Sequence, residues 1–169
     1  MYQCQKISTE AIEKAGKIIQ EFIASGFAHM PFNSIPNNRV FVSDISTSYL
    51  AYAKDNVVIE HYLLHPNTPK ITAHGHPFAN QMIVLAGKLN VYRKDAFIEV
   101  SSTVENTSNY KLSSITFPPF MHGFQVGDIG AVVYNIQIWN DTVTNPTSAT
   151  VEYYGEALGP VHALNLEQK

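Results

Sequence analysis

The order of apolar and polar residues divides the chain into one helical segment followed by many short β-rich runs. Over residues 8–25, apolar side chains recur every three or four positions, which is the period of an amphipathic helix. The acids Glu10 and Glu13 lie near its start and Gly26 follows its end, as is typical of helix termini. We predict that this helix packs on its own domain through its apolar face; the alternative is a helix that binds a partner.

From residue 40 the pattern changes to short runs rich in β-branched and aromatic residues. We count about ten such runs, separated by turn residues at near-regular spacing. They are 40–42, 49–53, 57–64, 81–86, 89–92, 97–104, 111–117, 120–126, 131–139 and 150–154. Many short strands of this kind are typical of an all-β sandwich or barrel. Because the chain shows no internal repeat and no linker, we predict a single domain over 1–169, with the barrel at 40–155 and a C-terminal tail at 156–169.

Composition and charge narrow the classes of partner. The formal net charge is −3 and the basic residues are scattered, whereas nucleic-acid and membrane binders present clustered positive charge. No apolar run approaches the roughly 20 residues needed to span a bilayer. The single cysteine, Cys4, cannot form an internal disulfide, and the first residues lack a signal-peptide pattern. We therefore expect a cytoplasmic protein that binds neither nucleic acid nor membrane.

A pair of histidines one residue apart is the first chemical signal. In the stretch ITAHGHPFANQMIVLAG, His74 and His76 flank a glycine. Residues two apart on a strand point to the same face, so both imidazole rings can aim at one metal ion. A third imidazole is available from His122, just after Pro118 and Pro119, which stiffen the backbone before it. The alternative is that the two histidines form only a polar corner where a strand begins.

These two segments resemble the two motifs of the cupin superfamily. In the first cupin motif, His-x-His is followed after three or four residues by a Glu and six residues later by a Gly. His74, His76 and Gly87 fall on the matching positions. Asn80 falls on the Glu position. The segment PPFMHGF resembles the second motif, with His122 at its metal-binding histidine.

Four departures from the family pattern affect what such a site can do. Thr68 stands where cupins often have a glycine, the second motif lacks its glycine, and Val126 replaces a family asparagine. Most important, Asn80 replaces the carboxylate, which leaves three neutral imidazoles and at most a weak amide oxygen. Three imidazoles suit Zn, Cu, Fe and Ni. Without the carboxylate, the charge of the ion is less compensated, which favours an anionic, bidentate substrate.

The resemblance covers roughly residues 57 to 139 and implies a cupin-type double-stranded β-helix, a jelly-roll barrel, preceded by the N-terminal helix. It also implies one divalent transition metal bound by His74, His76 and His122. Three-histidine cupins include thiol and diketone dioxygenases, so the first hypothesis is a mononuclear dioxygenase acting on a small anionic or bidentate molecule. Iron is the first choice of metal, with Zn, Mn or Ni as alternatives.

Two other function classes stay open. One is a cupin isomerase or epimerase, in which a pocket His or Tyr moves protons and the metal is optional. The other is a non-catalytic cupin that binds a small ligand. Because cupins generally pair through sheet edges, the resemblance further implies a homodimer, for which the apolar strands at 40–53 offer an edge.

Strand alternation predicts which residues line the interior. Residues on the face of Asn80 should line an apolar interior and the residues between them should pack on a second layer. The lining set is Met82, Val84 and Ala86, and the outward set is Ile83 and Leu85.

A predicted turn at 127–130 leaves two registers for the strand after it. The preferred register pairs His122 with Asn135 and brings three residues beside the metal, Asn135, Gln137 and Trp139. The other register brings Tyr134, Ile136 and Ile138 there. Phe78, Phe120 and Phe124 are expected to close the cavity, although aromatic core packing is the alternative. The expected substrate-binding residues are therefore Met82, Phe120, Phe124, Asn135, Gln137 and Trp139.

Four titratable side chains on the run 57–64 and its exit fall on two faces. His61 and His65 share one face, where we expect them at the rim or surface; a role as pocket acid–base groups is the alternative. Glu60 and Tyr62 lie on the opposite face and are equal candidates for the interior.

Overall fold

A computed structural model describes residues 6–31, 34–35, 40–42, 45–68, 74–93, 96–101, 122–146, 152–155 and 159–162. Its helix, α1, spans Thr9–Ala24. The Ser8 hydroxyl caps it by accepting the N–H of Ala11 at 3.1 Å, and the chain leaves it through Gly26 at φ +71°. The predicted helix over 8–25 is confirmed. No helix in the described residues combines the length and the apolar character needed to cross a membrane.

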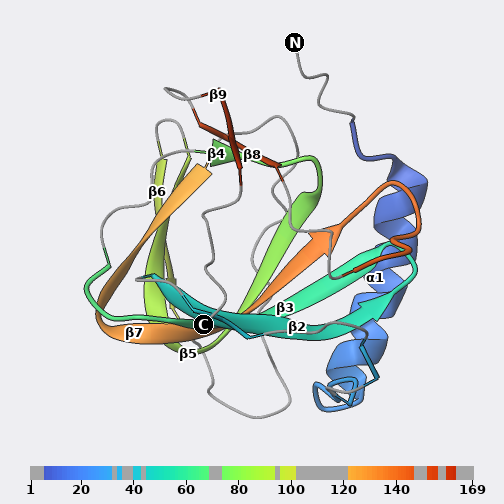
Figure 1. Ribbon diagram of the computed structural model, residues 1–169, viewed down its shortest axis with the longest axis horizontal. Helices are drawn as coiled ribbons and strands as arrows, with labels where there is room; N and C mark the ends of the chain where they lie inside the picture. The colour runs from blue at the N-terminus through green and yellow to red at the C-terminus, as the bar shows by residue number, and fades with distance from the viewer. Residues whose placement is uncertain are drawn as a thin grey trace.

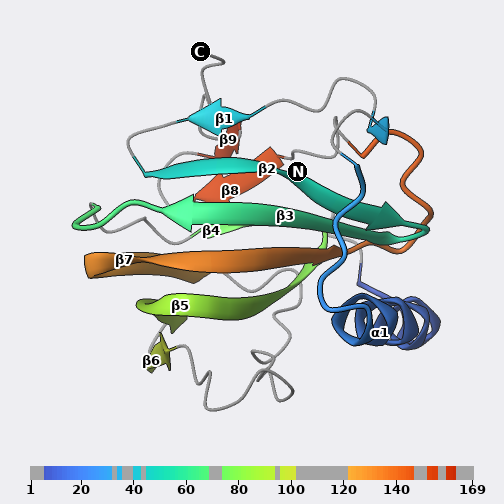
Figure 2. The ribbon, with the colours of Figure 1, turned by 90° about the horizontal axis from the view of Figure 1, so that it is seen from below.

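The nine described strands pair antiparallel throughout. They are β1 (Phe41–Val42), β2 (Ser46–Lys54), β3 (Val57–Leu64), β4 (His74–Gly75), β5 (Ala79–Arg93), β6 (Ala96–Ser101), β7 (His122–Ile138), β8 (Glu152–Gly155) and β9 (Gly159–His162). Figure 2 shows β1, β2, β3, β7 and β5 side by side in this order, and β7 continues to β4, β8 and β9 at its other end. The all-β fold of jelly-roll type is thus confirmed. Strand β9 falls within 156–169, the segment expected to be a tail.

Strands β5 and β7 form the longest strand pair among the described residues. They pair along their whole length, from Ala79 with Ile138 to Arg93 with His122, and Figure 1 shows both bending from one side of the barrel to the other. At the bend, Gly87 has φ +71°, and a Cβ on it would collide with the carbonyl oxygen of Gly130. Only glycine fits such a close approach.

This bend corrects the turn that we predicted at 127–130. Strand β7 runs through these residues without reversing, so both predicted registers are wrong. His122 has Arg93 on β5 and His74 on β4 as its register partners, and not Asn135. Glycine here bends a long strand where two backbones touch, a use that local sequence does not distinguish from a hairpin turn.

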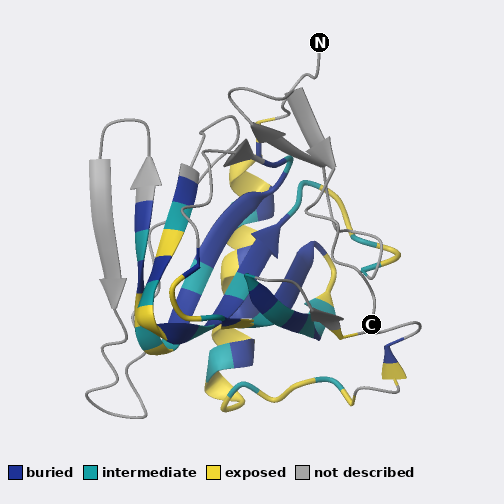
Figure 3. Cartoon of the chain, turned by 60° about the vertical axis from the view of Figure 1, so that its left-hand side comes forward, coloured by how far each residue is buried: buried dark blue, intermediate teal, exposed yellow. Residues whose placement is uncertain are grey.

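Helix α1 covers the outer face of the sheet made by β2, β3, β7 and β5. Its buried residues pack on Ala51, Val57, Ile59, Ala79, Ile83, Tyr134, Ile136 and Ile138. Figure 3 shows the strands beside the helix in dark blue and the solvent-facing turns of the helix in yellow. The helix packs on its own domain, as predicted. Strand alternation then turns the other residues of these strands toward the barrel interior.

Candidate functional site

The three predicted metal-binding histidines lie on neighbouring elements at one end of the barrel. His74 on β4 is the register partner of His122 on β7. His76 follows His74 by two residues and is buried. The side chains of His74 and His122 lie outside the described part, and the described side chains contain no group of three possible metal ligands. The fold thus brings two distant parts of the sequence together at the backbone level.

The ring of His76 is held in a defined tautomer. Its Nδ1 lies 2.8 Å from the carbonyl oxygen of Phe78, and the two rings stack with centroids 4.0 Å apart. A carbonyl oxygen can only accept, so Nδ1 donates the proton and the neutral ring keeps its lone pair on Nε2. A hydrogen bond from the second ring nitrogen to a backbone carbonyl is common among metal-binding histidines.

Asn80, which occupies the family's carboxylate position, is tied to β7 by its amide nitrogen. Its Nδ2 donates to Oδ1 of Asn135 and, at 3.5 Å, to the carbonyl oxygen of Ile136. No described residue donates to Oδ1 of Asn80, so this oxygen is the end of the amide that could meet a ligand.

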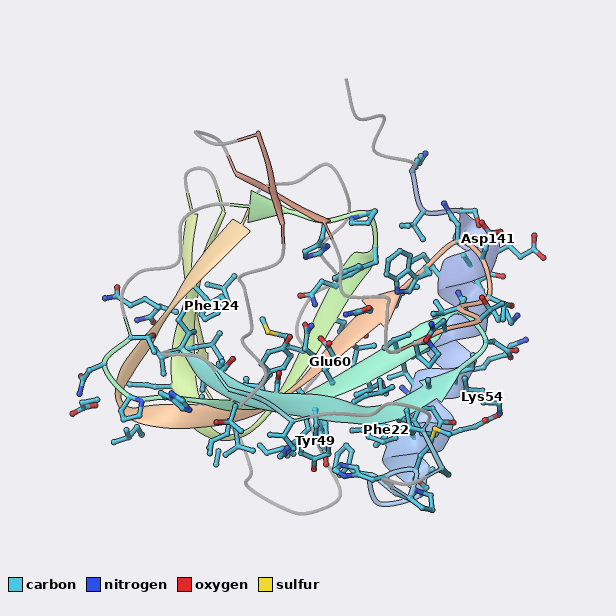
Figure 4. The ribbon with its side chains drawn as sticks, viewed as in Figure 1. Phe22, Tyr49, Lys54, Glu60, Phe124 and Asp141 are labelled. Atoms are coloured by element: carbon cyan, nitrogen blue, oxygen red, sulfur yellow. The ribbon has the colours of Figure 1, made fainter. Side chains whose placement is uncertain are left out.

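Glu60, on the face of β3 that points into the barrel, is a candidate that belongs to neither cupin-like motif; the alternation of the strand had named it, with Tyr62, for the interior. Figure 4 shows its side chain inside the barrel, on the opposite side of the strands from Tyr49. Its Oε2 accepts the Tyr62 hydroxyl at 2.9 Å, Nε2 of Gln137 at 3.2 Å and Nδ2 of Asn135 at 3.4 Å. In the sequence, Glu60 stands out as the single acid within the apolar run VVIEHYLL, on the same strand face as Tyr62.

The amides around Glu60 form one oriented network, which we call the Glu60 network: Glu60, Tyr62, Asn80, Asn135, Gln137 and Trp139. Asn80 donates to Asn135, which donates to Glu60. On the other side, Trp139 donates to Oε1 of Gln137 at 3.1 Å, and Gln137 donates to Glu60. Every chain of donors therefore ends on the same carboxyl oxygen.

Two opposing effects act on the protonation of Glu60. Burial raises the pKa of its carboxyl above the ordinary value of 4.5, while the three hydrogen bonds that it accepts lower this pKa by a smaller amount. Among the described residues, no cation forms an ion pair with it. The net effect is a raised pKa, which is the usual direction for a buried acid without a cationic partner.

An apolar cluster fills the other part of the interior. It consists of Leu64, Val84, Leu89, Val91, Val126, Ala131 and Val133, with Tyr62, Met82 and Phe124 packed against it. Met82 and Val84 thus face inward and Ile83 and Leu85 pack on the helix side, as predicted. Ala86 does not line the interior, because the register shifts after Val84 and leaves it exposed.

The predicted substrate-binding residues fall into three groups. Asn135, Gln137 and Trp139 belong to the Glu60 network, although they reach it through a register that we did not predict. Met82 and Phe124 belong to the apolar cluster. Phe120 lies outside the described residues. The residues of the other predicted register, Tyr134, Ile136 and Ile138, face α1 instead. Phe78 is buried between His76 and Trp139, with ring centroids 4.0 and 5.2 Å away.

A second group of titratable side chains lies on the outer face. Nε2 of His29 lies 2.6 Å from the Tyr134 hydroxyl and its Nδ1 lies 3.3 Å from the Tyr49 hydroxyl. The His61 ring lies 5.0 to 5.6 Å from these three rings, measured between centroids. Burial lowers the pKa of both histidines, and the charge of His29 lowers the pKa of His61 further.

His65 bonds with Thr47 at 3.0 Å and is half-buried, so neither His65 nor His61 points into the interior. His61 and His65 therefore lie where the alternation of the strand predicts.

Comparison with known proteins finds similarity in structure. No family model matches the sequence, and no curated protein matches it. A mutant of oxalate decarboxylase from Bacillus subtilis aligns with 67% of this chain and 29% of its own, with a TM-score of 0.52 and 13% identity. Another structure of that enzyme, from work on its Mn(II) centers, aligns with 72% of this chain and 31% of its own, with a TM-score of 0.51 and 13% identity. KdgF from Halomonas sp. aligns with 57% of this chain and 83% of its own, with a TM-score of 0.45 and 13% identity. The chain spans less than a third of oxalate decarboxylase, and identity this low shows a shared fold alone.

Proposed function

Because this chain has the cupin-superfamily fold, we propose that it is a metal-binding cupin whose barrel interior takes a small molecule. His74, His76 and His122 would bind one divalent transition metal. The observation that supports this is the register pairing of His74 with His122 beside the buried His76. Register partners in antiparallel strands are close enough for two imidazoles to share one ion.

Two described side chains at this place, those of His76 and Asn80, support this proposal. The bond from Nδ1 of His76 to Phe78 presents the ring in the tautomer that a metal requires. Asn80 is held by its nitrogen, so its oxygen could serve as a weak fourth ligand. A divalent ion at this place would supply a Lewis acid that orients an oxygen or sulfur atom of the substrate. The three neutral ligands leave most of its charge for an anionic, bidentate substrate.

For the reaction class, we propose an oxygenase of dioxygenase type that prefers ferrous iron and acts on a small anionic molecule. The apolar cluster would exclude bulk water, and Asn135 and Gln137 would orient polar groups of the substrate. The second candidate is an isomerase or epimerase, which is favoured by a specific observation: a buried carboxyl, Glu60, hydrogen-bonded to a phenol, Tyr62.

Equilibrium dialysis with Fe, Zn, Mn and Ni tests the metal site. The variants are His74→Ala, His76→Ala, His122→Ala and, as the matched control, His61→Ala on the outer face. We expect each of the first three to lose most of the bound metal and His61→Ala to retain it. If the three variants bind metal as well as the parent does, the metal site is refuted.

Two assays then separate the function classes. Oxygen uptake with small thiols, diketones and keto acids detects an oxygenase, and exchange of substrate hydrogen with deuterated water detects an isomerase. Absence of both, together with a ligand-induced thermal shift, would assign a non-catalytic binding protein.

A further inference from the structure

The two oxygens of the Glu60 carboxyl have different surroundings. Oε2 accepts all three hydrogen bonds, from Tyr62, Asn135 and Gln137. No described residue donates to Oε1, and this atom is not among the fully buried polar atoms that lack a partner. The residue as a whole keeps 9% of its surface accessible. Oε1 is therefore the oxygen that a molecule inside the barrel can reach.

This asymmetry determines which oxygen of Glu60 can take a proton while all three hydrogen bonds keep their direction. A carboxyl oxygen has two lone pairs, and three N–H and O–H groups already point at Oε2. A proton on Oε2 would displace the N–H of Asn135 or Gln137, or would reverse the hydrogen bond with the Tyr62 hydroxyl, which can also accept. A proton on Oε1 leaves all three bonds intact, with Oε2 acting as the carbonyl oxygen.

We propose that Glu60 is the acid–base group that contacts the ligand in the barrel interior, with Oε1 as the atom that holds and exchanges the proton. In the protonated form Oε1 donates to a ligand oxygen, and in the ionised form it accepts from a ligand hydroxyl. The ligand class that this geometry fits is a small molecule with a carbonyl or carboxylate oxygen. Delivery of such a molecule to this place rests on the proposed function of the barrel.

The described side chains around the Glu60 carboxyl are polar without charge, or apolar. Tyr62 is the one titratable group among the described residues that contacts it. From β7 the contacts come from Asn135 and Gln137, which are neutral. From β2 the register partner is Leu50, which is apolar. Among the described residues, the burial that raises the pKa of Glu60 thus acts without a nearby charge to oppose it.

The primary test is carbon-13 NMR on protein with labelled glutamate side-chain carboxyls, purified without added ligand. Glu60→Gln assigns the Glu60 resonance by its disappearance. Glu13→Gln, on the exposed side of α1, is the matched control and should leave the Glu60 resonance in place. We expect the Glu60 carboxyl to titrate at higher pH than the other glutamates. Titration together with the other glutamates would overturn the proposal.

The ligand class is tested with pyruvate, which carries both a carbonyl and a carboxylate. The amide of Glu60→Gln can keep all three bonds at its oxygen and place its NH2 group where Oε1 was, so it imitates the protonated acid. We expect the affinity of the parent to fall about tenfold for each pH unit above the pKa of Glu60, and the affinity of the variant to stay constant. Equal pH dependence in both proteins, or no binding of pyruvate by either, would overturn the ligand class.

Metal retention distinguishes this inference from the proposed function. We expect Glu60→Gln to retain metal as the parent does in equilibrium dialysis. If it loses the metal, Glu60 is a metal ligand and the proposal is wrong. If instead the histidine variants retain metal while the NMR titration is as expected, the metal site fails and the role of Glu60 stands.

Discussion

Two adjacent rows of register partners cross the same four strands and face opposite sides of the sheet. The inner row on β2, β3, β7 and β5 is Leu50, Glu60, Asn135 and Met82, and the outer row is Tyr49, His61, Tyr134 and Ile83. The outer row packs at the edge of the helix-covered core, where aromatic and imidazole rings contact one another. The inner row places a carboxyl and an amide inside the barrel.

The comparison shows that burial alone does not determine the chemistry of a face. A helix covers the outer face, and the histidines His29 and His61 lie at its edge, exposed and half-buried. The inner face carries an acid that is more buried than any outer histidine and has no counter-ion among the described residues. Since apolar residues of similar volume would stabilise the fold at least as well, the Glu60 network points to ligand chemistry.

The largest expected change in stability comes from a substitution on the outer face. Ile59 is fully buried under α1, so Ile59→Ala should lower the free energy of unfolding by about 2–5 kcal/mol through lost burial and a residual cavity. Urea denaturation measures this. Ile129→Ala is the control, because Ile129 is 69% exposed and should change stability by less than about 0.5 kcal/mol. Equal losses in the two variants would mean that the helix does not stabilise the sheet.

The next largest change in stability is expected from substitutions on the inner face. Glu60→Ala removes the shared acceptor of three donors and should lower the free energy of unfolding by about 1–3 kcal/mol. Tyr62→Phe removes one donor and should have a smaller effect, about 0.5–1.5 kcal/mol. Urea denaturation near pH 5 measures both. An Ala variant as stable as the parent would show that the network adds nothing to the fold.

Local periodicity was enough to predict the helix, the inward face of β3 and the inward face of β5 as far as Val84. Alternation along VVIEHYLL correctly separated Glu60 and Tyr62 from His61. The resemblance placed His122 near His74, and the backbone register agrees.

The sequence could not predict what depends on contacts between distant strands. The glycines at 127 and 130 look like a hairpin turn, but Gly130 supports a bend because it meets Gly87 on another strand. The Glu60 network requires the pairing of β3 with β7, which no local pattern specifies. Two adjacent residues, Glu60 and His61, therefore have environments that only the assembled sheet distinguishes.

The pH dependence of the free energy of unfolding also distinguishes the inner face from the outer face. Because the pKa of Glu60 is raised in the folded state, the folded chain keeps a proton that the unfolded chain has released. Glu60 thus contributes stability that is fully present below its unfolded pKa and is lost as the pH rises through its folded pKa. The free-energy advantage of Glu60→Gln over the parent should therefore grow with pH, by about 1.4 kcal/mol for each unit of pKa difference. Urea denaturation at a series of pH values measures it, and parallel curves for the two proteins would contradict it.

The smallest expected effect has the opposite sign and comes from the outer face. The pKa of His61 is lowered in the folded state, first by burial and then by His29, so the unfolded chain takes up a proton at a higher pH than the folded chain does. The contribution of His61 to stability is therefore present above its unfolded pKa of about 6.5 and is lost as the pH falls through its folded pKa. His61→Phe keeps a ring against Tyr49 and Tyr134 but cannot titrate, so its stability should fall less than that of the parent as the pH is lowered. The difference should be smaller than that for Glu60, because water reaches the half-buried imidazole and screens its charge. Denaturation is best measured in the Glu60→Gln background, where the opposing titration of the inner face is absent. If removal of His61 leaves the pH dependence unchanged, the His61 ring contributes packing to the outer cluster and its charge has no effect on folding.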